Sequence, residues 1–369
     1  MKFVEGKYTS AMIFTDSVED YAIAQIKMIC DNQAFEGSKI RIMPDVHPGK
    51  VGPIGFTATV KDRVLPMIVG IDIGCGMTMA KIKAKRVDGV QLDKLIRERV
   101  PAGFATRKKT HRFAQTFDFL RLKCVEHIRI EKAEEAVGTL GGGNHFIEVD
   151  KDDEGQLYVI IHSGSRHLGK EIAEYYMKEG QRVLTTNGLS VPYELTYLEG
   201  TLLEDYLHDV TVAQEYAETN RLAILDEILQ GMKWKQEETY SCIHNYIDTS
   251  CDLPVIRKGA ISAGAGERVI IPLNMRDGVI LGIGKGNAEW NISAPHGAGR
   301  IMKREDVKTK YTLSEFKKAM KGIYSTSVSR ETLDEAPFAY RGMEEITERI
   351  KETVEIDRIL RPVYNYKAG

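Results

Sequence analysis

The sequence lacks an excess of charge of either sign, because 51 lysines and arginines nearly balance 53 aspartates and glutamates. The net charge of −2 gives no global sign of a nucleic-acid partner. Two short basic segments, residues 81–86 and 107–112, are local exceptions. Each either meets a phosphate backbone or is simply a solvated strand edge or loop.

Long hydrophobic runs are also missing. The longest candidate, residues 64–73, is interrupted by Pro66, Gly70 and Asp72, so we expect no membrane span. The first residues lack the apolar core of a secretory signal. Five cysteines, an odd number in a long chain, do not suggest a disulfide framework. We therefore expect a reduced, cytoplasmic protein.

The remaining composition is that of a globular protein, with 43% hydrophobic and 28% charged residues. Repeats, low-complexity stretches and linkers are not evident, so we expect one mixed α/β (α+β) domain over residues 1–369. Hydrophobic alternation predicts strands at 40–43, 54–60, 64–73, 77–84, 146–149 and 157–161, with short strands in 252–286. The pattern turns helical between 87 and 136, where Leu92, Leu95 and Ile96 are spaced for one face and residues 113–130 carry another. Helical spacing also predicts helices at 170–178, 212–232 and 313–360, the last opened by a capping box at Thr312.

Two of the predicted strands bring histidines together. Residues 146–149 and 157–161 are joined by the acidic turn 150–155. His145 precedes the first strand, and His162 follows the second. If these strands pair antiparallel, both histidines lie at the same edge of the sheet, where sites are commonly built.

A candidate metal centre begins at Asp72-Ile-Gly-Cys75. A lone cysteine is usually an unreactive residue of the hydrophobic core. Cys75, however, lies in a glycine-containing turn, and the carboxylate of Asp72 is three residues away. A thiolate can bridge two metal ions, and His145, His162 and His244 are the natural remaining ligands. Any one of these histidines alone would more often be a core residue. The ligand types leave the metal open, since thiolate and imidazole favour zinc while carboxylate and phosphate oxygens favour manganese or magnesium.

Two glycine-containing segments are candidates for binding phosphate. Gly141-Gly-Gly-Asn144 offers backbone N–H groups and an amide, and Glu148 follows closely. Residues 163–166 offer a similar nest ending in Arg166, whose guanidinium suits bidentate phosphate contacts. A glycine triplet alone can also be only a flexible turn.

His296 stands apart from the other histidines, in Pro295-His-Gly-Ala-Gly-Arg300. Its small neighbours leave room for a bulky adduct, and Arg300 could stabilise phosphate charge. Residue spacing leaves three roles open for His296: nucleophile, metal ligand or structural residue. A nucleophile needs an acceptor at its second ring nitrogen, and Asp45 is a candidate.

Several ordered motifs resemble the RtcB family of GTP- and manganese-dependent RNA ligases. They are Met43-Pro-Asp-Val-His-Pro-Gly-Lys-Val-Gly, Gly70-Ile-Asp-Ile-Gly-Cys-Gly-Met77, Gly138-Thr-Leu-Gly-Gly-Gly-Asn-His-Phe-Ile-Glu148, His162-Ser-Gly-Ser-Arg166 and His296-Gly-Ala-Gly-Arg300. The resemblance runs from about residue 40 to Lys367. It implies joining of an RNA 3′-phosphate or 2′,3′-cyclic phosphate to a 5′-hydroxyl, in RNA repair or tRNA splicing.

The resemblance also implies roles for individual residues. His296 would take GMP from GTP before GMP passes to the RNA. Asn144 and Arg300 would contact GTP phosphates or the RNA ends. The ligands of two manganese ions would be Asp72, Cys75, His145, His162 and His244, with Cys75 bridging, and guanine would be held by Phe146, Glu148, Tyr340 and Lys367. An archease-type activator is a further partner that the resemblance raises.

One departure from the family pattern is His167, which stands where the family usually has glycine. Its side chain either alters access to the metal or packs outward. Two other functions remain open: a binuclear metal-dependent phosphatase or cyclic phosphodiesterase, which would use water as the nucleophile, and a GTP-binding regulatory protein without turnover.

Overall fold

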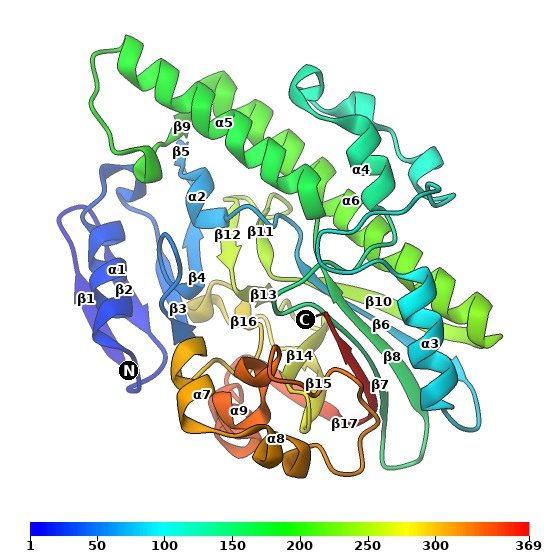
Figure 1. The fold of residues 1–369 in the computed structure, drawn as a ribbon. Helices are drawn as coiled ribbons and strands as arrows, with labels where there is room; N and C mark the ends of the chain where they lie inside the picture. The colour runs from blue at the N-terminus through cyan, green and yellow to red at the C-terminus, as the bar shows by residue number, and fades with distance from the viewer. Residues whose placement is uncertain (369) are drawn as a thin grey trace.

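Two large β-sheets form the centre of the computed structural model, which describes residues 1–368 (Figure 1). The strands of the first sheet are Lys2–Glu5 (β1), Ser10–Ile13 (β2), Ile40–His47 (β3), Ile54–Thr59 (β4), Asn245–Asp248 (β11) and Val255–Lys258 (β12). Their order is β1-β2-β3-β4-β12-β11. Only β2 and β3 pair in parallel.

The second sheet is antiparallel throughout and has the order β10-β6-β8-β7-β17-β15-β14. Its strands are Gly76–Lys83 (β6), Phe146–Lys151 (β7), Leu157–Ser163 (β8), Lys235–Ile243 (β10), Arg268–Asn274 (β14), Gly278–Gly284 (β15) and Val354–Lys367 (β17). Two short pairs complete the strands: Ala260–Ser262 (β13) with Ser293–Pro295 (β16), and Arg63–Val64 (β5) with Leu198–Glu199 (β9).

Helices cover these sheets on opposite sides of the molecule. They are Asp20–Cys30 (α1), Pro66–Val69 (α2), Gly89–Arg99 (α3), Ile130–Ala136 (α4), Arg166–Thr186 (α5), Gly200–Met232 (α6), Arg304–Lys310 (α7), Leu313–Ala319 (α8) and Met343–Arg349 (α9). The long α5 and α6 lie along one side, and α7, α8 and α9 gather at the other (Figure 1). Ile224 and Ile228 of α6 pack in one buried core with strands β7 and β8. Within residues 1–368, no helix is both long and apolar enough to cross a membrane.

One end of the second sheet collects the predicted metal ligands. β6 begins and β8 ends at the paired residues Gly76 and Ser163, while Phe146 at the start of β7 faces His162. β10 ends at Ile243, opposite Gly76, and β17 ends at Lys367, opposite Phe146. Strand register alone therefore places Cys75, His145, His162 and His244 together. The antiparallel pairing predicted for residues 146–149 and 157–161 is confirmed.

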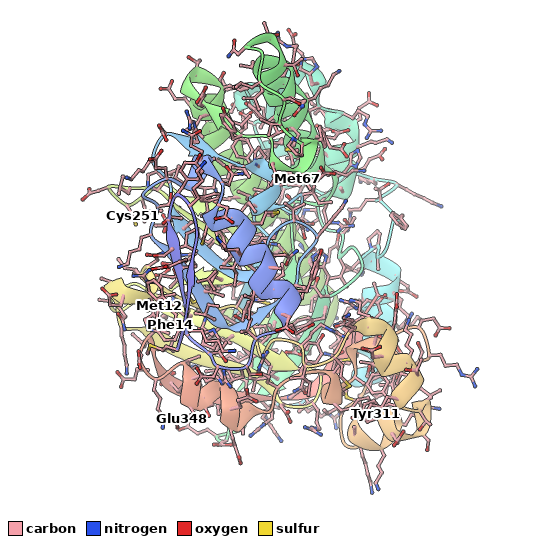
Figure 2. The ribbon with its side chains drawn as sticks, turned by 90° about the vertical axis from the view of Figure 1, so that its left-hand side faces the viewer. Met12, Phe14, Met67, Cys251, Tyr311 and Glu348 are labelled. Atoms are coloured by element: carbon pink, nitrogen blue, oxygen red, sulfur yellow. The ribbon has the colours of Figure 1, made fainter. Side chains whose placement is uncertain are left out.

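A stacked aromatic pair joins the first sheet to the segment that carries His296. Phe14, the residue that follows β2, stacks on Trp290 with ring centroids 3.8 Å apart. Figure 2 labels Phe14 close to Met12 of β2. Trp290 comes just before β16, which ends one residue before His296. The stack therefore helps to fix the position of His296 relative to β3.

Several predicted elements are wrong. Residues 64–73 are not a strand, because Pro66 opens the short helix α2 and a turn follows it. Residues 113–130 form a series of 3₁₀ turns before α4 rather than one helix. The strand predicted at 40–43 is too short, since β3 continues through Pro44 to His47. The helix α1 was not predicted at all.

The predicted helical tail is only partly helical. The capping box at Thr312 and Glu315 is present and opens α8. However, 354–367 form the longest strand of the second sheet, because they pair with both β15 and β7. The mixed α/β class is confirmed, and the extent of one domain over 1–369 stays a prediction.

The five cysteines are all unpaired. Cys251 lies at the surface in the turn between β11 and β12 (Figure 2), whereas Cys30, Cys75, Cys124 and Cys242 are buried. Only Cys75 belongs to a group of side chains arranged to hold a metal.

Candidate active site

Five side chains converge at the end of the second sheet as two groups of metal-type donors. Cys75, His162 and His244 form one group, and Asp72, Cys75 and His145 form the other. The sulfur of Cys75 lies 3.3 Å from Nε2 of His162 and 3.4 Å from Nε2 of His145. Cys75 thus belongs to both groups. That its thiolate bridges two metal ions stays a prediction.

The protonation of this cluster suits metal binding. Burial lowers the pKa of His162 and of His244, so both rings are neutral near pH 7, the form that ligates metals. Burial would raise the pKa of Asp72, but the hydrogen bond and charge of His145 lower it to about 2. Burial raises the pKa of the Cys75 thiol, and a coordinated cation would remove that proton. Nε2 of His162 also faces Nε2 of His244 at 3.2 Å, an arrangement that a shared cation would satisfy.

Backbone carbonyl groups orient two of the histidines. Nδ1 of His145 lies 2.8 Å from the oxygen of Leu140, and Nδ1 of His162 lies 3.1 Å from the oxygen of Asn144. With the proton on Nδ1, each ring turns the lone pair of Nε2 toward the cluster. This is the usual way in which a protein selects the ligating nitrogen.

Two glycines make room for the cluster. Gly74 has a φ of +74°, and a Cβ there would lie 2.9 Å from the Cα of Gln214 in α6. A Cβ at Gly164 would overlap the carboxylate of Asp72. Glycine is therefore needed at both positions. Gly74 has a left-handed backbone conformation and lies close to α6, and Gly164 leaves space for the carboxylate of Asp72.

Two buried polar residues of α6 hold these segments together, and the sequence analysis missed both. Arg221 donates to the carbonyl oxygens of Gly74 (2.8 Å) and Ser163 (3.0 Å). Asn220 accepts from the backbone N–H of Gly138 and donates to the carbonyl of Gly164. The available signal was a pair of polar residues on the otherwise apolar face of a predicted helix.

His296 lies next to the metal-type cluster and is held by Asp45. Nδ1 of His296 is 2.7 Å from Oδ2 of Asp45, which is fully buried. The ring centroid of His296 is 4.9 Å from that of His244. The predicted contact between Asp45 and His296 is therefore present in the structure. His47, from the same motif, turns its own Nδ1 to the backbone oxygen of Asp45 at 3.1 Å.

A cavity opens beside His296. Among its lining residues are seven of the predicted catalytic and nucleotide-binding residues: Asn144, Phe146, Glu148, His296, Arg300, Tyr340 and Lys367. His162 and His244 line it as well, so the cavity reaches the metal-type cluster. The structure thus brings together residues that are more than 220 positions apart in the chain.

A buried carboxylate, Glu335, organises one wall of this cavity. It pairs with Lys367 and Arg304 and accepts a hydrogen bond of 2.6 Å from the hydroxyl of Tyr340. Burial would raise the pKa of Glu335, but the charges of Lys367 and Arg304 lower it to about 2. Glu335 stands in an ordinary charged stretch, so nothing in the sequence marked it as a site residue.

Two further carboxyl groups, Glu148 and Asp150, are buried on one face of β7. Asn365 donates to Oε2 of Glu148 at 2.9 Å. Burial raises the pKa of Glu148 to about 7 and raises the pKa of Asp150 as well. Within residues 1–368, no N–H or hydroxyl donates to the carboxylate of Asp150. A proton held between the two carboxyl groups would satisfy both.

Two residues singled out in the sequence lie away from the cavity. Arg166 donates to the carbonyl oxygen of Gly103 at 3.1 Å and packs under Gly141, on the Asp72 side of the cluster. His167 turns outward and lies 2.8 Å from Glu171, one turn along α5. Of the two alternatives for His167, outward packing is therefore the one observed.

Comparison with known proteins identifies the family. The sequence model of the family "tRNA-splicing ligase RtcB" matches residues 34–121 and 116–368. The chain belongs to the RtcB family. It is 30% identical to the RNA-splicing ligase RtcB of Escherichia coli strain K12, over 88% of each chain. It is 26% identical to the tRNA-splicing ligase RtcB of Aeropyrum pernix, over 96% of this chain and 93% of the relative. The residues matched by the family model include the donor cluster, Asp45 and His296.

Proposed function

We propose that the protein is an RNA ligase that joins a 3′-phosphate or 2′,3′-cyclic phosphate end to a 5′-hydroxyl end through a histidine–GMP intermediate. The observation that carries the proposal is the position of His296. It is held by buried Asp45 at a cavity that also contains Glu148 and Lys367 and reaches the metal-type cluster. The relatives named above are RNA-splicing and tRNA-splicing ligases, which supports the same reaction class.

The chemistry at His296 follows from its contact with Asp45. The carboxylate accepts the proton on Nδ1, which leaves the lone pair on Nε2 free to attack the α-phosphate of GTP. An N–P bond forms, the bond to the β-phosphate oxygen breaks, and pyrophosphate leaves. The RNA 3′-phosphate then takes GMP, and the 5′-hydroxyl displaces GMP to seal the strand. A cyclic phosphate is first opened by hydrolysis.

The cavity walls suit guanine and phosphates. An ionised Glu148 would accept from N1–H and N2–H of guanine, and Lys367 would donate to O6. Phe146 and Tyr340 provide aromatic surface, and Asn144 and Arg300 provide donors for phosphate oxygens. Two manganese ions, held by the two donor groups that share Cys75, would supply Lewis-acid stabilisation of phosphate charge.

The test is incubation of purified protein with Mn²⁺ and α-labelled GTP. We expect protein-bound label that survives alkali but not acid, and no label on His296→Ala. Ligation of RNA carrying either kind of 3′-end should be lost in the same variant. If His296→Ala instead retains full phosphate-releasing activity and wild type carries no label, the protein is a metal-dependent phosphatase or cyclic phosphodiesterase. Tight GTP binding without any label would favour a regulatory protein.

The proposal extends to the cellular setting. Five unpaired cysteines fit a reducing compartment, so we place the protein in the cytoplasm. RNA repair and tRNA splicing are the candidate processes, and an archease-type activator is a candidate partner. Repeating the label experiment with and without such an activator, over several turnovers, would test the need for it.

A further inference from the structure

A second, wider cleft lies beside the loop that follows α3, away from the nucleotide cavity. Five cationic side chains line it, against two carboxylates: Arg97, Arg99, Arg107, Lys108 and Lys109, against Glu98 and Glu227. This is a local excess of positive charge on a chain whose net charge is −2. Such a cleft attracts a polyanion.

Part of this charge is free to bind a ligand. Arg107 donates to Glu227 at 2.5 Å and to the carbonyl of Arg99 at 2.9 Å, so it holds the loop in place. Lys108 and Lys109 are exposed, and no carboxylate within residues 1–368 lies within 4 Å of either amine. Of the two readings of segment 107–112, the free lysines favour a phosphate-binding surface over a solvated loop.

The same loop carries Phe104, whose side chain is fully exposed at 108%. No other large hydrophobic side chain in residues 1–368 has so high an exposed fraction. A single exposed apolar residue is ordinary by itself. An exposed aromatic ring next to unpaired cations is the combination that binds single-stranded nucleic acid, since the ring stacks on a base while the cations meet phosphates.

Hydrogen bonds connect this loop to the metal-type cluster. The N–H of Gly103 donates to the oxygen of Gly141 at 2.9 Å, and Arg166 donates to the oxygen of Gly103. Gly141 belongs to the glycine loop that leads to His145, and the charge of Arg166 acts on Asp72. The loop that carries Phe104 is therefore linked to the Asp72 end of the cluster, whereas His296 lies beside His244 at the other end.

We propose that Phe104, Lys108 and Lys109 bind a single-stranded segment of the RNA substrate and guide its end toward the Asp72 side of the cluster. This inference rests on the proposed ligase function and adds a strand-binding surface to it. Phe104 stacks on an unpaired base, and the two lysines contact backbone phosphates. A duplex is the wrong ligand for Phe104, because its bases are already stacked on one another.

The first experiment measures binding of a labelled single-stranded RNA of roughly ten nucleotides by fluorescence anisotropy. Phe104→Ala should weaken binding about tenfold, and Phe104→Leu should weaken it nearly as much, because leucine is apolar but cannot stack as a ring does. Phe104→Trp should bind as well as wild type. The matched control is Tyr21→Ala, which removes an exposed aromatic ring from α1 and should change nothing. Equal affinity of wild type and Phe104→Ala would overturn the stacking role, as would equal losses on duplex and single strand.

The second experiment measures the salt dependence of the same binding. Each phosphate contact on a single strand contributes about −0.7 to the slope of log K against log salt concentration. The double variant Lys108→Ser with Lys109→Ser should therefore reduce the slope by about 1.4. The control Lys2→Ser with Lys7→Ser removes two exposed lysines near β1 and should leave the slope unchanged. An unchanged slope in the Lys108 and Lys109 variant would overturn the phosphate contacts.

Failure of this inference is distinguishable from failure of the proposed function. If wild type forms no GMP adduct and joins no RNA, the ligase proposal fails. If wild type ligates RNA but the Phe104 and lysine variants bind and join short strands as wild type does, only the binding surface is wrong. Because Phe104, Lys108 and Lys109 are exposed, the thermal unfolding midpoints of their variants should match that of wild type.

Discussion

At the scale of single residues, three of the histidines in the site are oriented by specific neighbours. Backbone oxygens orient His145 and His162, and the carboxylate of Asp45 orients His296. Asp45 belongs to neither metal-type donor group. Its effect on reactivity can therefore be separated from metal binding.

We predict that Asp45→Asn slows GMP transfer from GTP to the protein by about 10²–10⁴-fold. The amide can present N–H to Nδ1 and favour the tautomer that protonates Nε2, the attacking nitrogen. It also carries no charge to stabilise the ring as positive charge develops. The measurement is the rate of label transfer from α-labelled GTP. Bound Mn²⁺ should stay at the wild-type level, and loss of metal with loss of rate would contradict this role.

The close approach of Gly164 to Asp72 allows the role of Asp72 in metal binding to be tested by itself. A methyl group there would overlap the Asp72 carboxylate, so Asp72 must move in Gly164→Ala. The affinity for Mn²⁺ of the group formed by Asp72, Cys75 and His145 should fall by about tenfold or more in the variant. The affinity of the group that contains His162 and His244 should stay at the wild-type level. Equilibrium dialysis against Mn²⁺ should then show two classes of affinity. Gly342→Ala, which meets no atom within 4 Å, is the control. Equal weakening of both sites would contradict the assignment of Asp72 to one group.

The residue scale also shows what sequence can identify. Residues in unusual glycine-containing motifs were recognised, and the structure gathers most of them around one cavity and one cluster. Glu335 and Asn220 were not recognised, because each is an ordinary residue type in an ordinary segment. They become site residues only through contacts with parts of the chain far away in sequence.

At the scale of elements, α6 is the helix that fixes the site. Its buried residues Asn220 and Arg221 bond to the backbone at the start of β6, the end of β8 and the loop before His145. These hydrogen bonds hold the turns that carry Asp72 and Cys75 and that follow His162, where the backbone leaves the sheet and has no neighbouring strand.

We predict that Asn220→Ala lowers the free energy of unfolding by about 2–4 kcal/mol. The variant leaves the N–H of Gly138 and the carbonyl of Gly164 buried without a partner, while the N–H of Thr139 keeps its bond to the oxygen of Ala136. Urea unfolding of wild type and variant measures the difference. Gln230→Ala, at an exposed position of the same helix, should change stability by less than about 0.5 kcal/mol. A similar small effect at Asn220 would show that the surrounding groups find other partners.

Element prediction failed where local pattern and tertiary context disagree. Residues 64–73 are apolar on all sides, which fits a buried strand, yet Pro66 starts a helix at that point. Residues 354–367 contain charges spaced as in a helix, but pairing with β15 and β7 selects the extended form. Strands 146–149 and 157–161 were predicted well because the turn between them is local and the alternation is clear.

At the scale of the whole molecule, the cavity beside His296 is assembled from distant parts of the chain. Glu148 comes from β7, Glu335 from the segment before α9, and Asn365 and Lys367 from the C-terminal strand β17. Register between β17 and β7 places Asn365 opposite Glu148 and Lys367 opposite Phe146. Folding of the C-terminal strand therefore sets the charge balance around Glu148.

This assembly predicts how GTP binding depends on pH. Burial raises the pKa of Glu148 to about 7, so its carboxyl is largely protonated below that pH in the free protein. Only the ionised form can accept from both N1–H and N2–H of guanine. GTP affinity should therefore rise by up to about tenfold per pH unit as pH increases toward 7, and level off above it. Isothermal titration calorimetry measures the GTP affinity between pH 6 and pH 8, which is a range of roughly one pH unit on either side of the pKa of Glu148.

Stability should change in the opposite direction, and Glu148→Gln tests both effects. A carboxyl whose pKa is raised by folding stabilises the protein below its unfolded pKa, and this stability is lost as pH rises through about 7. The glutamine in Glu148→Gln carries no charge. At pH 8 the free energy of unfolding of this variant should therefore exceed that of wild type by on the order of 1–3 kcal/mol, while its affinity for GTP should be lower. The phosphates of GTP also titrate near pH 6, so the informative quantity is the difference between variant and wild type. Glu355→Gln, at an exposed position of β17, should show neither change. If Glu148→Gln keeps the full pH dependence of GTP affinity, another group controls it and Glu148 does not contact guanine as an ionised carboxylate.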